Sequence, residues 1–184
     1  MKPIFSIHAG EYLVGSFIEE TYKDYNVWIP SKDTGVDFLV TNKDNSLTAS
    51  IQVKFSKDFL ITHGRKEHQD KLVSCGWWTL NREKIETSPA DLWVMVIHTF
   101  NDKNMQYVVI DPKELHSRMS KIHPTAKSLQ TYLWVTSSKR CWETRGLKKT
   151  DQNLIANDEY TNNVRDFSSF LNNWSPLENK LSNT

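Results

Sequence analysis

The stretch that decides the fold is Leu92-Trp93-Val94-Met95-Val96-Ile97, six consecutive apolar residues. A strand that faces solvent on one side alternates apolar and polar residues, so an uninterrupted apolar run is typical of a strand buried on both faces. The sequence therefore predicts a central strand over residues 92–97. Tyr107-Val108-Val109-Ile110 is a second apolar run, and we expect it to be the neighbouring strand.

A helix and three strands are predicted before this central strand. Val14, Phe17, Ile18 and Thr21 recur at helical spacing and predict a helix over residues 10–22. The predicted strands cover residues 27–29, 36–41 and 48–55, and the turn-rich connector 42–46 favours a hairpin between the last two. Residues 56–76 are polar and poorly periodic, which predicts a variable segment.

Two helices and one strand are predicted in the second half of the chain. Asp111 and Pro112 are typical of a helix start, and we expect that helix to run to Ile122. A short strand is expected at residues 132–135. Apolar residues then recur at spacings of four and three from Tyr160 to Trp174, which predicts an amphipathic helix that ends before Pro176.

This order of elements favours an α/β fold with a mixed central sheet flanked by helices. A length of 184 residues fits a single domain over residues 1–184, in which residues 101–184 extend the sheet and supply the C-terminal helix. No apolar run is long enough for a membrane span, and no apolar segment near the start indicates a signal peptide. Cys75 and Cys141 are far apart and match no metal motif, so we expect idle thiols in a reducing cytoplasm.

Three polar residues interrupt otherwise apolar strands. Asp37 stands near the start of one predicted strand, and Gln52 and Lys54 stand two residues apart on the next, so the latter two share a face. A hairpin would bring a carboxylate, an amide and an amine together. Because burying such groups without partners is costly, they need a reason to be there. Two interpretations remain open, namely a plain Asp37–Lys54 ion pair and a catalytic site.

The pattern resembles the PD-(D/E)XK nuclease superfamily, which has the restriction-endonuclease-like fold. In that family a helix carries a glutamate, a hairpin carries an aspartate, and the following strand carries (D/E/Q)-x-K. The corresponding segments here are Gly10-Glu11-Tyr12-Leu13-Val14, Gly35-Val36-Asp37 and Gln52-Val53-Lys54, and the glutamine is similar to the Mrr-type branch. Gly76-Trp77-Trp78 and Ala90 to Val96 also resemble members of this superfamily, so the similarity covers about residues 10–100 as a nuclease-like core.

The resemblance implies a catalytic set of Glu11, Asp37, Gln52 and Lys54, and a Mg²⁺ or Mn²⁺ ion held by oxygen atoms. The implied metal ligands are Glu11, Asp37, the Gln52 side-chain carbonyl and the Val53 backbone carbonyl. Lys54 would orient or deprotonate the attacking water. Gln52 is neutral, so this site carries fewer negative charges than its Asp or Glu counterparts. Glu20 is the alternative to Glu11 as the helix carboxylate.

Two segments carry candidate nucleic-acid-binding residues. Residues 139–149 have a local excess of four positive charges and an interleaved tryptophan, in Lys139, Arg140, Trp142, Arg145, Lys148 and Lys149. Lys57, Arg65 and Lys66 form a weaker second group. A solvated loop explains residues 139–149 equally well, and a flexible surface loop is the simpler interpretation of the second group. The overall net charge of +1 does not by itself indicate a nucleic-acid binder.

The function expected from this sequence is hydrolysis of DNA phosphodiester bonds by a metal-dependent endonuclease, in defence, restriction or DNA processing. Cutting both strands requires two sites, which favours a homodimer or a partner subunit. Two alternatives stay open: an inactive nuclease-fold module that binds nucleic acid or a partner, and a nuclease specific for RNA or for junctions.

Overall fold

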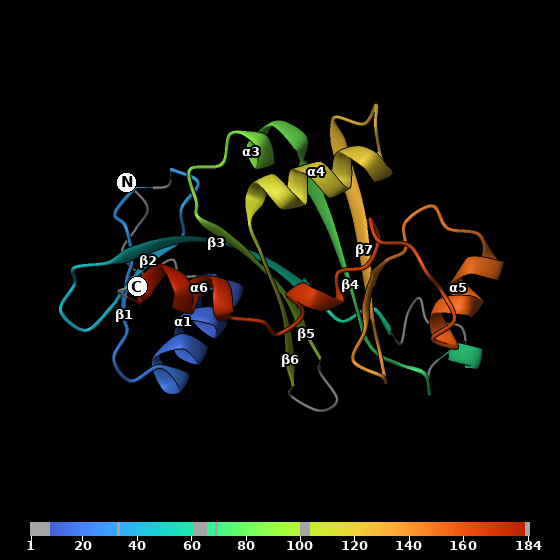
Figure 1. Ribbon diagram of the computed structural model, residues 1–184, viewed down its shortest axis with the longest axis horizontal. Coiled ribbons are helices and arrows are strands. Elements are labelled where there is room, and N and C mark those ends of the chain that lie inside the picture. The colour runs from blue at the N-terminus through green and yellow to red at the C-terminus, as the bar shows by residue number, and fades with distance from the viewer. Residues whose placement is uncertain (1–7, 33, 61–65, 69, 100–103, 183–184) are drawn as a thin grey trace.

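The computed structural model describes residues 8–32, 34–60, 66–68, 70–99 and 104–182 (Figure 1). Its first sheet has five strands in the order β1-β2-β3-β5-β6. These strands are β1 (Asn26–Trp28), β2 (Phe38–Thr41), β3 (Thr48–Lys57), β5 (Leu92–His98) and β6 (Met105–Ile110). Only β3 and β5 pair in parallel, so the sheet is mixed. Residues 92–97 are all buried, and β5 lies between β3 and β6 as predicted.

A second, antiparallel sheet has the order β4-β7-β8. Its strands are β4 (Leu72–Asn81), β7 (Ser128–Thr136) and β8 (Cys141–Glu143). The prediction of a variable segment up to residue 76 was therefore wrong for residues 72–76. Ser74 and Gly76 are buried there although neither is apolar, and this hides the alternation of a strand. The strand expected at residues 132–135 is longer than predicted.

Five helices flank the two sheets in the described part of the chain. They are α1 (Ala9–Thr21), α3 (Arg82–Glu86), α4 (Pro112–Ile122), α5 (Lys149–Ala156) and α6 (Ser175–Leu181), with short 3₁₀ turns at Lys66–His68 and Ser168–Phe170. The predicted α1 and α4 are confirmed. Asp111 caps α4, because its carboxylate accepts hydrogen bonds from the backbone N–H groups of Lys113 and Glu114. No described helix combines the length and the apolar character needed to cross a membrane.

The amphipathic helix predicted from Tyr160 to Trp174 does not form. Phe167 belongs to the apolar cluster that contains α4, whereas Trp174 belongs to the cluster that contains α1, so the helical spacing of these residues arises by coincidence. Asn162 bonds to the local backbone N–H groups of Val164 and Arg165, which competes with helix formation. Pro176 lies in the first turn of α6 and begins a helix there.

The alternating side chains of β5 divide the core between the two faces of the first sheet. Leu92, Val94 and Val96 pack with α1 and α6 on one face. Trp93, Met95 and Ile97 pack with α4 and the second sheet on the other. Figure 1 shows α1 and α6 close together, with β4 and β7 towards the opposite end of the molecule. This arrangement fits the general α/β class.

Gly76 is a position at which β4 of the second sheet packs closely against β5 of the first. A Cβ atom built there would lie 2.3 Å from Trp78 Cη2 and 2.7 Å from Ile97 Cγ1. Gly76→Ala is therefore expected to lower the free energy of unfolding by about 1–3 kcal/mol, because both neighbours are buried and must shift. Urea unfolding measures this change.

Gly15→Ala is the matched control, because its Cβ would meet only Val27 Cγ1 at 3.7 Å, an ordinary contact. Gly15 lies inside α1, where alanine is favoured by up to about 1 kcal/mol. Equal stability changes in the two variants would contradict the close approach at Gly76.

Candidate functional site

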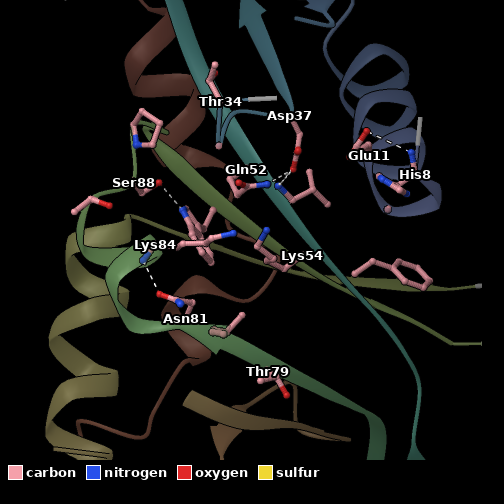
Figure 2. A pocket seen from close by; sticks show the side chains of 18 of the residues that line it. His8, Glu11, Thr34, Asp37, Gln52, Lys54, Thr79, Asn81, Lys84 and Ser88 are labelled. Atoms are coloured by element: carbon pink, nitrogen blue, oxygen red, sulfur yellow. Dashed lines mark hydrogen bonds between the residues drawn. The ribbon is translucent and has the colours of Figure 1, made fainter. Parts of the chain in front are cut away.

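A pocket opens where β2 stops pairing with β3. The last cross-strand pair is Phe38–Ile51, and β3 then continues to Lys57 without β2 beside it. The start of α1 and the β4–α3 segment close the space from two sides. The pocket has a volume of about 1110 Å³, and Glu11, Asp37, Gln52, Val53 and Lys54 all line it (Figure 2).

Asp37 continues the hydrogen-bonding ladder at the end of β2. Its backbone N–H donates to the Ile51 carbonyl at 2.8 Å. Its carboxylate Oδ2 accepts hydrogen bonds from Gln52 Nε2 and, at 2.7 Å, from the Val53 backbone N–H. The side chain is 8% exposed. The expected meeting of Asp37 with the Gln52-Val53-Lys54 segment therefore occurs, and these bonds fix the position of the carboxylate.

Gln52 and Val53 approach Asp37 as hydrogen-bond donors. The expected metal ligands are instead their carbonyl oxygens. The N–H and C=O groups of one residue leave a regular strand on the same side, so the Val53 carbonyl also faces the β2 side of β3. The Gln52 side-chain carbonyl belongs to the same amide group whose Nε2 donates a hydrogen bond to the Asp37 carboxylate.

Lys54 is half-buried and stands on the same face of β3 as Gln52. Its Nζ lies 5.1 Å from the centroid of the Trp93 ring, which is a cation–π contact. Ser88 Oγ fixes that indole by accepting a hydrogen bond from Trp93 Nε1 at 2.8 Å. Trp78 Nε1 donates to the Lys54 carbonyl at 3.2 Å, which joins the second sheet to this strand. Lys54 is thus positioned from two directions.

The two candidate helix carboxylates differ in place. Glu11 is half-buried in the first turn of α1, lines the pocket, and accepts a hydrogen bond from the His8 backbone N–H at 3.3 Å (Figure 2). Glu20 is exposed near the other end of α1 and does not line the pocket. Glu11 is therefore the glutamate that α1 brings to this site.

The pocket offers oxygen donors of the type that Mg²⁺ and Mn²⁺ prefer. Two carboxylates line it, those of Glu11 and Asp37, together with an amide oxygen and a backbone carbonyl. Within the described ranges, no three His, Cys, Asp or Glu side chains gather closely enough to hold a metal. The donor set fits a hard cation that is held by few charges, and such a cation would bind weakly.

A second cation at the pocket was missed by the sequence reasoning. Lys84 lies on α3, is exposed, and pairs with no acidic side chain in the described part of the chain. Figure 2 shows its side chain extending towards the part of the pocket that holds Lys54. Asn81 begins α3 by accepting a hydrogen bond from the Lys84 N–H at 3.0 Å. A helix of five residues leaves no periodic signal, so the sequence did not reveal Lys84.

None of the predicted nucleic-acid-binding residues that the structure describes lines the pocket. Lys57 is exposed, with its Nζ 5.2 Å from the Phe59 ring centroid. Arg65 lies outside the described residues, and so does the side chain of Lys66.

Trp142, a candidate nucleic-acid-binding residue, is 1% exposed, so its ring has no open face on which a base could stack. Its ring packs against Tyr160 and beneath the Arg140 guanidinium, at 5.2 and 4.6 Å between centres. Arg140 is itself paired with Asp166 at 2.7 Å. Lys139, Arg145, Lys148 and Lys149 are exposed, and Lys149 pairs with Glu67 at 3.5 Å.

Glu143 of the same segment is fully buried. Burial raises its pKa to about 7, although the Arg165 guanidinium, 2.5 Å from Oε2, favours the charged form. The folded protein therefore keeps this proton to a higher pH than the unfolded chain does. As a result, the contribution of Glu143 to the free energy of unfolding falls as the pH rises.

The free energy of unfolding of the wild type, minus that of Glu143→Gln, is expected to fall as the pH rises from 4.5 to about 7. The fall should be on the order of 3 kcal/mol. Urea unfolding at several pH values measures it, with the exposed Glu83→Gln as the control. Parallel pH profiles for the wild type and Glu143→Gln would contradict it.

Comparisons of the chain with models of protein families, with curated proteins and with solved structures found no match.

Proposed function

We propose that this protein is a metal-dependent endonuclease that hydrolyses DNA phosphodiester bonds. The observation that carries the proposal is the convergence of Glu11, Asp37, Gln52 and Lys54 on one pocket, although they come from three separate segments. The sequence pattern predicts these four residues as a set, independently of where the fold places them. Their resemblance to the PD-(D/E)XK pattern supplies the reaction.

In this proposal, Asp37 and Glu11 hold Mg²⁺ or Mn²⁺, assisted by the Gln52 amide oxygen and the Val53 carbonyl. The bound ion would lower the pKa of a water molecule and offset charge on the phosphate. The hydrogen bonds from Gln52 and Val53 to the Asp37 carboxylate support this role, because they keep the charged group in one orientation.

Lys54 orients the attacking water and stabilises the negative charge that develops on the phosphate. Its contact with Trp93 supports this role by restricting the ammonium group to the pocket. Lys84 adds a second positive charge from α3, on the side of the pocket that holds Lys54, where it holds the phosphate of the substrate. Two cations beside two carboxylates suit an anionic substrate that arrives with a cation.

The direct test is incubation of the purified protein with supercoiled plasmid, single-stranded DNA and RNA, each with Mg²⁺, Mn²⁺ or EDTA. Cutting of DNA that requires metal is the expected result, and cutting of both plasmid strands would support a homodimer or a partner subunit. If the protein cuts RNA alone, the substrate is RNA and not DNA. Binding without cutting under any metal would contradict the enzyme and favour an inactive nuclease-fold module.

A further inference from the structure

An exposed aromatic surface lies beside the pocket, on β4. Trp77 is 41% exposed, and its ring meets the Phe59 ring edge-on, with 6.2 Å between centroids. Lys57 Nζ stands 5.2 Å from the centre of the same Phe59 ring. We call Trp77, Phe59 and Lys57 the aromatic platform.

The platform continues directly into the pocket. Trp77, Thr79 and Asn81 alternate along β4 as its exposed residues, so they share one face. Thr79 and Asn81 line the pocket, which places Trp77 about 7 Å along the strand from its wall. The Trp77 N–H also donates to Ser56 Oγ at 2.9 Å, which joins the platform to β3 two residues beyond Lys54.

The charge at the platform fits a polyanion. Lys57 is exposed beside the Phe59 ring, and Lys54 and Lys84 line the pocket that Thr79 and Asn81 also line. Aromatic side chains interleaved with cations are the arrangement by which proteins bind unpaired nucleotides, with bases stacked on rings and phosphates on lysines. In a duplex the base faces are already stacked, so an exposed indole beside a phosphate site has little to contact there.

We propose that the aromatic platform binds an unpaired base next to the phosphate held in the pocket, and that the substrate is a single-stranded segment of nucleic acid. The inference rests on the proposed phosphodiester site, whose substrate it narrows. Trp77 takes the role that the sequence assigned to Trp142, because Trp77 is exposed beside cations and Trp142 is buried.

The test is binding in EDTA, measured by fluorescence anisotropy with labelled oligonucleotides. Four probes of equal length are compared: single-stranded DNA, single-stranded RNA, duplex DNA and an abasic single strand. We expect the single strands with bases to bind more tightly than the duplex and the abasic strand. The DNA and RNA arms identify which sugar the site accepts.

Trp77→Leu is expected to weaken binding of the single strand about tenfold and to leave duplex binding unchanged. Leucine keeps an apolar contact with Phe59 but has no flat face. Trp77→Phe is expected to retain most of the affinity, which separates stacking from a folding defect. Trp28→Ala is the control, because Trp28 is 51% exposed and lies on β1, two strands from β3.

Three results would overturn the inference: full affinity in Trp77→Leu, equal affinity for the abasic strand, or preference for the duplex. Because no metal is present, these results do not depend on cleavage. If Trp77-dependent binding is found but no metal supports cutting, the proposed function fails and the base-binding platform stands. If the duplex is cut and Trp77→Leu cuts it normally, the proposed function stands and the platform fails.

Discussion

Lys54→Ala is expected to reduce metal-dependent DNA cleavage by about 100- to 1,000-fold. The reason is that the ammonium group would stabilise charge that appears only in the transition state, and removal of one such group costs enzymes about this much. Cleavage of plasmid DNA by equal amounts of folded protein measures the effect. Lys54→Arg should also cleave DNA slowly, because the guanidinium does not release a proton at neutral pH and is larger than the ammonium group.

The same variant decides between the catalytic site and a plain ion pair between Asp37 and Lys54. If the pair is only structural, Lys54→Ala lowers the unfolding temperature while the cleavage rate per folded molecule stays near that of the wild type. Lys43→Ala is the matched control, because Lys43 is an exposed lysine in the β2–β3 connector, paired with Asp24 at 2.8 Å. Loss of cleavage in Lys43→Ala as well would contradict a specific role for Lys54.

Asp37→Asn is expected to abolish the stabilisation of the folded protein by Mn²⁺ and to reduce cleavage at least as strongly as Lys54→Ala. The asparagine has the same shape and keeps an oxygen to accept the Val53 N–H, but it removes one of the two carboxylates of the pocket. A ligand at 100 times its dissociation constant stabilises the folded state by about 2.7 kcal/mol. Thermal unfolding with and without Mn²⁺ measures this gain in both proteins.

Asp44→Asn serves as the control, since Asp44 is exposed in the β2–β3 connector and bonds locally, to Ser46 and Asn42. An equal Mn²⁺ effect in Asp37→Asn and the wild type would show that any metal site lies elsewhere. A poor contact between the new amide and Gln52 would lower the stability of Asp37→Asn even without metal. Thermal unfolding without Mn²⁺ measures that loss separately from the effect of the metal.

Local patterns predicted correctly the elements whose own side chains decide their structure. The apolar run 92–97 forms β5, and the Asp111–Pro112 start forms α4. The prediction of a helix from Tyr160 to Trp174 was wrong because Phe167 and Trp174 pack into two different apolar clusters. The spacing of residues along the chain does not determine which cluster a side chain joins.

The sequence by itself determined the inner set of the candidate site. The sequence leaves Glu20 as an alternative to Glu11, and the packing of α1 decides between them. The period of two along β3 puts Gln52 and Lys54 on one face, and the hairpin register brings Asp37 against Val53. These relations are local or span a single hairpin, so few alternatives exist.

Only the tertiary structure decided what surrounds that set. Trp93 is placed by the parallel pairing of β5 with β3. Lys84 on α3 and Trp77 on β4 reach the pocket or its edge, and their place depends on how the second sheet packs against the first. The same packing buries Trp142, which stands among basic residues in the sequence, and exposes Trp77, which does not. Contacts between distant segments depend on the summed packing of many side chains, and no short pattern along the chain encodes that sum.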